Sequence, residues 1–304
     1  MLLARGPGRN WRRGAALVAV AALVGCRNTP EPAAQPTPGT PPPRFGHVFI
    51  VVEENRNYAD VIGNPAMPYL NGLAQQYGLA TQYYADTHPS IGNYFMMTVG
   101  DTVTNNDGYT GTVGKDNVVR RLMAAARTWK SYAEDLPSVG YHTPGVVGKY
   151  ASRHVPLSYL TEVVNDSAQL KHLVPFTQLA ADMAGDTLPE YGFIVPNLCH
   201  DAHDCAVDSA DTWLSRNIDP LIKHPTFQRD GLLIIVYDES GNDNTAGGGR
   251  IAWVAVSGKS RAGYQSAALY QHASTLRLSL AALGITDLPN AAATAPQMGE
   301  FFTP

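Results

Sequence analysis

Residues 47–53 read HVFIVVE and residues 231–237 read GLLIIVY, and these two runs decide the fold. Both are almost continuously apolar and rich in β-branched side chains, which is typical of strands buried on both faces of a sheet. Residues 191–196 (YGFIVP) and 251–257 (IAWVAVS) are two further candidate strands. Stretches with helical spacing occur at about residues 65–77, 91–99, 116–127, 175–184, 208–222 and 271–283. Because such alternation favours parallel pairing, we predict an α/β fold with a doubly wound, mostly parallel central sheet and helices on both faces.

The composition of the 304-residue chain is that of a globular protein, with 44% hydrophobic and 16% charged residues. Its net charge of −4 and the lack of a long basic run after the N-terminus argue against nucleic acid as a partner. Three cysteines are too few for a disulfide scaffold. Residues 45–304 contain no repeat and no second linker, and we interpret them as one domain.

The first 25 residues have the pattern of an export signal. They contain four arginines and no acid, and the apolar run over residues 14–24 is too short to span a bilayer with ease. The run ends Leu23-Val24-Gly25-Cys26, which is similar to the lipobox of bacterial lipoproteins. We therefore predict a lipoprotein signal peptide over residues 1–25 and a lipid anchor on Cys26. An ordinary signal peptide with a chance cysteine is the alternative.

Residues 26–44 are rich in proline and are expected to form an extended tether. The chain would then be an exported lipoprotein of the cell envelope, held by its lipid anchor on the periplasmic or outer-surface side of a membrane. Without the four N-terminal arginines, 18 basic residues face 26 acidic ones, a net charge of −8. An acidic protein that handles phosphate needs a cation to offset the repulsion.

Polar residues directly follow the apolar runs, where open parallel sheets place their functional sites. Glu54 and Asn55 follow the first run, and Asp238 and Glu239 follow the run at 231–237. Carboxylate and amide oxygens suit a hard or borderline divalent cation, so these four residues are the candidate metal ligands. Neighbouring strand residues point to opposite faces, and we therefore expect Glu53 to be a surface acid outside the site.

Ser90 is the candidate nucleophile. It follows His88 and Pro89, and the apolar spacing after it indicates that a helix begins here. The free N–H groups of a helix N-terminus favour an anion, and a nearby cation lowers the cost of forming an alkoxide. From spacing alone, a plain N-cap for Ser90 and a structural role for His88 stay open.

Five motifs in the same order extend this pattern: Glu54-Asn55-Arg56, His88-Pro89-Ser90-x-x-Asn93-Tyr94, Pro196-Asn197-x-x-x-Asp201-x-His203-Asp204, Asp238-Glu239-x-Gly241 and Tyr270-x-His272-x-Ser274. Together they resemble the bacterial phosphoesterase family that groups phosphatidylcholine-type phospholipases C with certain acid phosphatases. That family belongs with the alkaline-phosphatase-like superfamily. The resemblance covers about residues 45–285.

The resemblance implies an alkaline-phosphatase-like fold and hydrolysis of a phosphoric ester through a covalent phosphoryl-enzyme. It assigns the nucleophile to Ser90, because related enzymes place their nucleophile three residues before an Asn, here Asn93. It assigns metal binding to the two strand-end pairs named above. The candidate catalytic histidines, which would contact the phosphoryl group or protonate the leaving oxygen, are His88, His203, His272 and, from its place before Pro156, His154.

The candidate substrate-binding residues are Asn93, Asn197, Asp201 and His200. Position 200 is His where the family pattern leads us to expect Asn, so His200 is either an extra ligand or a loop residue. Cys199 and Cys205 enclose this loop, and export makes a disulfide between them reasonable, with two free thiols as the alternative. Residues 129–137 and residues 150–154, which include Arg153 and His154, are expected at the rim of the site.

We therefore predict an exported, membrane-anchored phosphoesterase that resembles an acid phosphatase and uses a serine nucleophile and a divalent metal ion. The extra C-terminal domains of the larger family phospholipases find no counterpart, which favours a small phosphate ester as substrate. A phospholipase C is the first alternative. The second is a non-catalytic envelope lipoprotein that binds phosphate or sugar.

Overall fold

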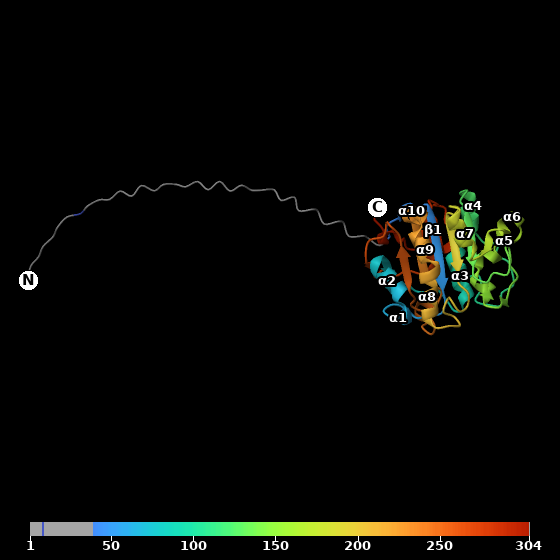
Figure 1. Cartoon of the computed structure of the whole chain (residues 1–304), viewed down its shortest axis with the longest axis horizontal. Coiled ribbons are helices and arrows are strands. Elements are labelled where there is room, and N and C mark those ends of the chain that lie inside the picture. Colours follow the sequence, from blue (N-terminus) through green and yellow to red (C-terminus); the bar gives the residue numbers. More distant parts are fainter. Residues whose placement is uncertain (1–7, 9–38, 304) are drawn as a thin grey trace, which may run out of the picture. The chain divides into compact units, whose positions relative to one another are not determined.

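The computed structural model describes Gly8 and residues 39–303, and Figure 1 shows the arrangement of its elements. An eight-stranded sheet in the order β10-β2-β9-β8-β1-β7-β3-β6 forms the centre. The strands are β1 (His47–Glu53), β2 (Gly78–Ala80), β3 (Trp129–Ala133), β6 (Leu173–Pro175), β7 (Tyr191–Val195), β8 (Gly231–Tyr237), β9 (Trp253–Val256) and β10 (Tyr264–Ser266). Within this sheet, β9 alone runs antiparallel to its neighbours, so the prediction of a mostly parallel sheet is confirmed.

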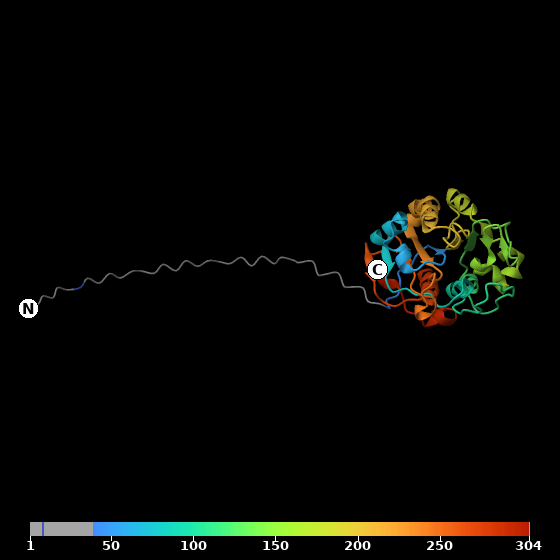
Figure 2. The same cartoon turned by 90° about the horizontal axis from the view of Figure 1, so that it is seen from below.

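Helices cover both faces of the sheet, as the view along it shows (Figure 2). The α-helices are α1 (Tyr58–Val61), α2 (Pro68–Gln76), α3 (Ser90–Thr98), α4 (Val118–Ala124), α5 (Thr161–Val164), α6 (Ser167–Leu170), α7 (Gln178–Ala184), α8 (Val207–Asn217), α9 (Asp219–Lys223), α10 (Pro225–Asp230) and α11 (His272–Ala282). Short 3-10 helices are η1 (Ser152–His154), η2 (Pro156–Tyr159), η3 (Thr245–Gly247), η4 (Asn290–Ala293) and η5 (Gly299–Phe301). A two-stranded hairpin of β4 (Val146–Val147) and β5 (Tyr150–Ala151) stands apart from the main sheet.

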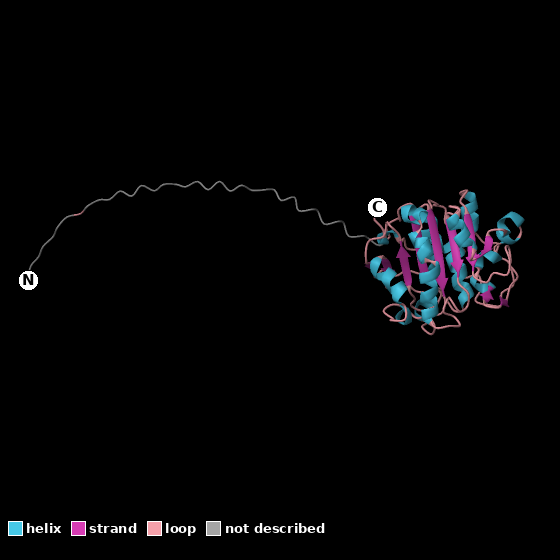
Figure 3. Ribbon diagram, viewed as in Figure 1, coloured by secondary structure: helices cyan, strands magenta, loops and turns pink. Residues whose placement is uncertain are grey.

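The two runs that decided the fold are central neighbours. β1 pairs with β8 from His47 opposite Gly231 to Glu53 opposite Tyr237, and β7 pairs with the other edge of β1. Val48 to Val52 are completely buried, which explains why the run lacks polar alternation. Because the three strands run in one direction, their carboxyl ends meet at a common edge of the sheet (Figure 3).

Three details of the chain differ from the sequence prediction. The helix expected over residues 208–222 is divided into α8 and α9, since Pro220 in the first turn of α9 has no N–H to continue the hydrogen bonds of α8. Residues 129–133 are strand β3 inside the sheet and not a rim, and Lys130 pairs with Asp182 at 2.7 Å.

The third difference lies at the start of the folded domain. Apart from Gly8, the predicted signal peptide lies outside the described residues, as do Cys26 and most of the predicted tether. The described part of the tether, residues 39–44, already belongs to the fold, because the Thr40 carbonyl accepts a hydrogen bond of 2.9 Å from the N–H of Gly299. Within the described residues, no helix is both long enough and apolar enough to cross a membrane.

Candidate active site

The turn after β1 and the turn after β8 bring the polar strand ends together. The N–H of Asp238 donates to the Glu53 carbonyl at 2.9 Å, and the N–H of Asn55 donates to Oδ1 of Asp238 at 3.1 Å. Asn55 adopts a φ of 43°, a left-handed conformation that asparagine tolerates better than most residues. This turn reverses the side-chain direction of the strand, so that Glu54 and Asn55 both reach the sheet edge.

The first residue of α3, Ser90, points its hydroxyl into this group of acids. Its Oγ lies 3.1 Å from Oε2 of Glu54 and 3.2 Å from Oε1 of Glu239. The side-chain amide of Asn55 is 3.4 Å away. Ser90 is only 2% exposed, so its hydroxyl is fixed by the fold and not by solvent. The structure therefore places the candidate nucleophile and the candidate metal ligands around one point.

The side-chain amide of Asn55 lies between three carboxylates and can face them in two orientations. Its terminal group lies 3.1 Å from Glu54 Oε2, 3.2 Å from Asp238 Oδ1 and 3.1 Å from Glu239 Oε1. With its NH₂ group turned toward them, the amide donates to all three carboxylates. With its oxygen turned toward them, four oxygens face one another, and only a cation between them satisfies the arrangement.

Burial and mutual repulsion make the acids reluctant to ionise. Loss of hydration, then the charge of Asp238, raises the pKa of Glu54 well above its ordinary value. Burial, then the charge of Glu239, raises the pKa of Asp238 well above its ordinary value. Burial also raises the pKa of Glu239 to about 7. Burial is the main cause of all three shifts, and repulsion between neighbouring acids adds to those of Glu54 and Asp238; a bound cation would favour the ionised forms.

The donor set fits a divalent ion. Oδ2 of Asp238 is buried and has no hydrogen-bond partner among the residues that the structure describes, as expected of an oxygen that can bind another ligand. No three His, Cys, Asp or Glu side chains within residues 39–303 already stand in a complete metal-binding arrangement. The cluster is instead closed by the Asn55 amide and the Ser90 hydroxyl, and both of these groups can also offer an oxygen to a cation.

The five candidate histidines occupy different places. Nδ1 of His88 contacts Oε2 of Glu239 at 2.6 Å and Nε2 lies 3.1 Å from the Asp243 carbonyl, so His88 borders the cluster. His203 is partly exposed and its Nδ1 is 2.7 Å from Oδ1 of Asp204. His88 and His203 are thus both partly exposed rings whose Nδ1 contacts a carboxylate.

His154 and His272 are buried. Nε2 of His154 lies 3.4 Å from Oε1 of Glu54 and its Nδ1 lies 3.4 Å from Oδ2 of Asp201, which makes it a bridge behind the cluster. Burial lowers the pKa of His154 well below its ordinary value and that of His272 to about 4. His272 donates from Nε2 to the Asp238 carbonyl at 2.6 Å. It therefore orients the β8 turn, and a role of His272 in contacting the phosphoryl group or protonating the leaving oxygen stays a prediction.

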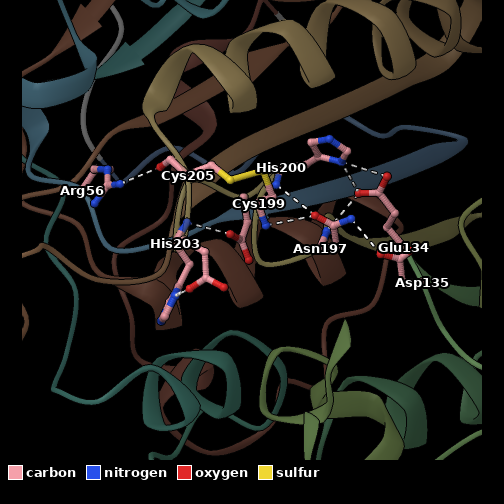
Figure 4. Close-up of a disulfide and its surroundings, with 10 residues drawn as sticks. Arg56, Glu134, Asp135, Asn197, Cys199, His200, His203 and Cys205 are labelled. Atoms are coloured by element: carbon pink, nitrogen blue, oxygen red, sulfur yellow. Dashed lines mark hydrogen bonds and ion pairs between the residues drawn. A yellow bond between two sulfur atoms is a disulfide. The ribbon is translucent and has the colours of Figure 1, made fainter. Parts of the chain in front are cut away.

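Three predicted substrate-binding residues make hydrogen bonds or ion pairs to other parts of the protein. Asn93 is fully buried, and its side-chain oxygen accepts hydrogen bonds from Asp86 N–H and Thr87 N–H, which shapes the loop before Ser90. Asn197 donates to Asp135 and accepts from the backbone of the disulfide loop (Figure 4). The ring of His200 pairs with Glu134 at 2.9 Å, and Figure 4 shows it on the Glu134 side of the loop.

The loop of Asp201 and His203 is closed by a disulfide between Cys199 and Cys205, as the sequence suggested (Figure 4). Arg56 donates to the Cys205 carbonyl at 2.9 Å and ties this loop to the turn after β1. The Asp201 carbonyl accepts a hydrogen bond of 2.8 Å from the N–H of Glu54. Burial raises the pKa of the Asp201 side chain to about 7.

Two residues of the site received no chemical role from the sequence, although Tyr94 lies in a quoted motif and Arg153 in a predicted rim segment. The hydroxyl of Tyr94 donates a very short hydrogen bond to Oε1 of Glu54, and both side chains are completely buried. Tyr94 lies four residues after Ser90 on α3, a spacing that places both on one helix face and could have identified it. Arg153 in η1 lies beside His154, and its Nη2 is 3.5 Å from Nε2 of His203. No spacing in the sequence connected Arg153 to the motifs.

Glu53 contradicts its predicted role as a surface acid. It is fully buried on the other face of the sheet edge, and neither of its carboxylate oxygens has a hydrogen-bond partner within the described residues. Loss of hydration, then the charge of Asp201, raises the pKa of Glu53 well above its ordinary value. The strand is covered by helices on both faces, so an acid at its last residue cannot reach solvent.

The mostly parallel sheet with helices on both faces has the fold of the alkaline-phosphatase-like proteins. A sequence model of the Phosphoesterase family matches residues 64–284, and the chain belongs to this family. Among solved structures of the same fold, the lipoteichoic acid synthase LtaP from Listeria monocytogenes superposes with a TM-score of 0.57 at 12% identity, covering 85% of this chain and 77% of that chain. A protein of the alkaline phosphatase superfamily from Vibrio parahaemolyticus gives a TM-score of 0.54 at 15% identity, covering 85% of this chain and 72% of that chain.

Two curated relatives are more similar in sequence. A phosphatidylinositol-3-phosphatase from Mycobacterium tuberculosis is 35% identical over 199 residues, which are 65% of this chain and 64% of that protein. An acid phosphatase from Aspergillus fumigatus is 32% identical over 205 residues, which are 65% of this chain and 45% of that enzyme. The matches therefore span less than two thirds of the length of either relative.

Proposed function

We propose that this protein hydrolyses phosphate monoesters with Ser90 as the nucleophile, in a site that holds a divalent metal ion. The observation that carries the proposal is the convergence on the Ser90 hydroxyl of two carboxylates at 3.1 Å and 3.2 Å. A serine surrounded by acids is poorly placed for binding an anion by itself. The arrangement becomes useful when a cation offsets the acids and stabilises the ionised hydroxyl.

The metal would be held by Glu54, Asn55, Asp238 and Glu239, with the Asn55 amide oxygen turned inward. A bound divalent ion supplies Lewis-acid stabilisation of the negative charge on the phosphoryl oxygens. The chain's own part is to position the Ser90 oxygen at the start of α3 and to receive its proton on a neighbouring carboxylate. Glu239 lies within hydrogen-bond distance of the Ser90 hydroxyl for that transfer, at 3.2 Å.

The remaining steps need a proton donor and a water molecule. Attack of Ser90 on phosphorus forms a phosphoserine and releases the alcohol, which takes up a proton as it leaves. His203 is suited to donate this proton, because it is partly exposed and Asp204 orients its ring. Water then cleaves the phosphoserine and restores the hydroxyl. His88 assists by holding Glu239 in place from Nδ1.

A monoester is favoured by the names of the two curated relatives, which are both phosphatases. The sequence supports export and anchoring through Cys26. If this is right, a Cys26→Ser variant appears in the soluble fraction of the producing bacterium while the wild type stays with membranes. Membrane retention of the variant would refute the lipid anchor without touching the proposed chemistry.

The test of the chemistry is Ser90→Ala, assayed on p-nitrophenyl phosphate with divalent metal and again with chelator. We expect a loss of at least about 10³-fold in kcat, as for other nucleophile deletions, and loss of wild-type activity in the chelator. Ser131→Ala is the matched control, because Ser131 is equally buried but lies on β3, and it should stay close to wild type. Turnover by Ser90→Ala would exclude the covalent route. Tight phosphate binding by a wild type that turns over no ester would favour the non-catalytic alternative.

A further inference from the structure

The charge of the site is unbalanced toward the negative even when a metal is bound. Glu54, Asp238 and Glu239 surround Ser90, and the buried Asp201 lies behind them. When all four are ionised, one divalent ion leaves an excess of two negative charges. A phosphate monoester brings two more near neutral pH, so its binding requires another positive group close to Ser90.

Arg56 and Arg153 are the two arginines whose contacts connect them to this region. Arg56 is engaged, because its guanidinium donates to the carbonyls of Asn55 at 3.2 Å and Cys205 at 2.9 Å. Arg153 is held more loosely, with Nη2 3.5 Å from His203 Nε2 and Nε 3.6 Å from Asp107 Oδ2. Within the described residues, Nε of Arg153 is buried and has no hydrogen bond.

The partners of Arg153 place its guanidinium next to the start of α3. Asp107 contacts Arg153 with Oδ2 and accepts a hydrogen bond from the Ile91 N–H at 3.1 Å with Oδ1. Ile91 is the residue after Ser90, and His203 is the candidate proton donor. The guanidinium thus spans the space between the nucleophile's helix and the loop of His203. Its charge also acts on the ionisation of Glu239 and Asp201.

We propose that Arg153 binds the phosphoryl group of the substrate and selects doubly charged monoesters over singly charged diesters. This inference rests on the proposed function and deepens it by naming the substrate class. Two of the donors of a guanidinium can contact two phosphoryl oxygens, and the ion pair with Asp107 at 3.6 Å leaves the Arg153 donors available for them. A diester has one charged oxygen fewer to offer, so the contribution of Arg153 to its binding is smaller. The phospholipase C alternative, which needs a diester, is disfavoured by this residue.

The experiment compares wild type, Arg153→Gln and Arg153→Lys on p-nitrophenyl phosphate and bis(p-nitrophenyl) phosphate. Loss of a charge-assisted contact predicts that kcat/KM for the monoester falls about 10- to 100-fold in Arg153→Gln, with less than about tenfold for the diester. The affinity for inorganic phosphate, measured by calorimetry, should fall about tenfold or more, and Arg153→Lys should recover part of it. Arg120→Gln is the charge control, since Arg120 is an exposed arginine on α4 that pairs with Glu162.

The outcomes separate the two proposals. Equal losses on monoester and diester, or unchanged phosphate affinity in Arg153→Gln, would overturn the role of Arg153 while the wild type remains a phosphatase. A wild type without esterase activity would overturn the proposed function, and the phosphate titration would still decide whether Arg153 binds the anion. Thermal unfolding of each variant distinguishes lost contacts from lost folding, and Arg153→Lys retains the charge if Arg153→Gln is unstable.

Discussion

Removal of the Tyr94 hydroxyl tests whether the acid cluster is built to bind metal. Tyr94 donates to Oε1 of Glu54, which leaves Oε2 of the same carboxylate facing Ser90. Burial, then the charge of Glu54, raises the pKa of Tyr94 well above its ordinary value, so the hydroxyl keeps its proton and remains a donor. Tyr94→Phe deletes this one hydrogen bond. The ring that stacks on His154 with centroids 5.1 Å apart is retained.

The size of the effect follows from the burial of both partners. An acceptor left without a donor in a site with no solvent costs about 1–3 kcal/mol. Since about 1.4 kcal/mol corresponds to a factor of ten in a binding constant, the affinity for a divalent ion should fall about 10-fold or somewhat more. Losses of about 10- to 100-fold are usual when the partner of a metal-binding side chain is removed.

The assay is calorimetric titration of the metal-free protein with Zn²⁺ and, separately, with Mn²⁺. Tyr132→Phe is the matched control, because the Tyr132 hydroxyl donates to Oδ2 of the buried Asp182 at 2.6 Å on another part of the sheet. Both variants should lose stability, but only Tyr94→Phe should lose metal affinity. Equal metal affinity in wild type and Tyr94→Phe would refute the reasoning that Glu54 is an oriented metal ligand.

Three more outcomes are expected. Burial raises the pKa of Asp201 and of Glu239 to about 7, so near neutral pH the metal-free fold holds protons that the unfolded chain has released. The stability that these two protonated groups contribute is therefore lost as pH rises through about 7. Added metal should therefore raise the melting temperature more at about pH 8 than at about pH 5, and a pH-independent increase would contradict this. Glu53→Gln removes a buried carboxyl with a raised pKa, and it should stabilise the protein increasingly as pH rises, as measured by urea unfolding. Destabilisation at alkaline pH would show instead that Glu53 is ionised and paired. Replacing Cys199 and Cys205 by Ser should lower the free energy of unfolding by about 2 kcal/mol, because the disulfide closes a short loop. The same change should weaken substrate binding, measured as a higher KM. An unchanged KM would show that the disulfide is not required to position the loop for substrate binding.

The sheet centre could be predicted from the sequence because burial leaves an unmistakable pattern. In β1, Val48 to Val52 are apolar since helices cover both faces, and the same holds along β8. β3 was missed because Lys130 and Ser131 interrupt its apolar run. Lys130 is tolerated there only because Asp182 pairs with it from α7, a contact that no local spacing reveals.

The site was predictable where its residues lie in consecutive motifs and unpredictable where they meet through the fold. Glu54, Asn55 and Ser90 could be named because strand ends and a helix start are local features. Arg153 could be placed only in a rim segment, since its position beside His203 depends on how η1 and the disulfide loop pack. The same limit explains His272, whose motif position indicated chemistry although the fold buries the ring against the β8 turn.

The cluster at the sheet edge is costly to the fold, and this cost supports the proposed role of the cluster in binding a metal ion. Three buried acids with raised pKa values meet at one point, which destabilises the protein whenever they ionise without a counter-charge. Apolar residues at the same strand ends would avoid this cost. The Asn55 amide reconciles the two states, because it donates to the acids when its nitrogen faces them and joins them as a fourth oxygen when a cation is present. A purely structural role would leave Ser90 and an unpartnered Asp238 oxygen in the middle of this group without a reason, whereas a metal-assisted serine nucleophile requires both.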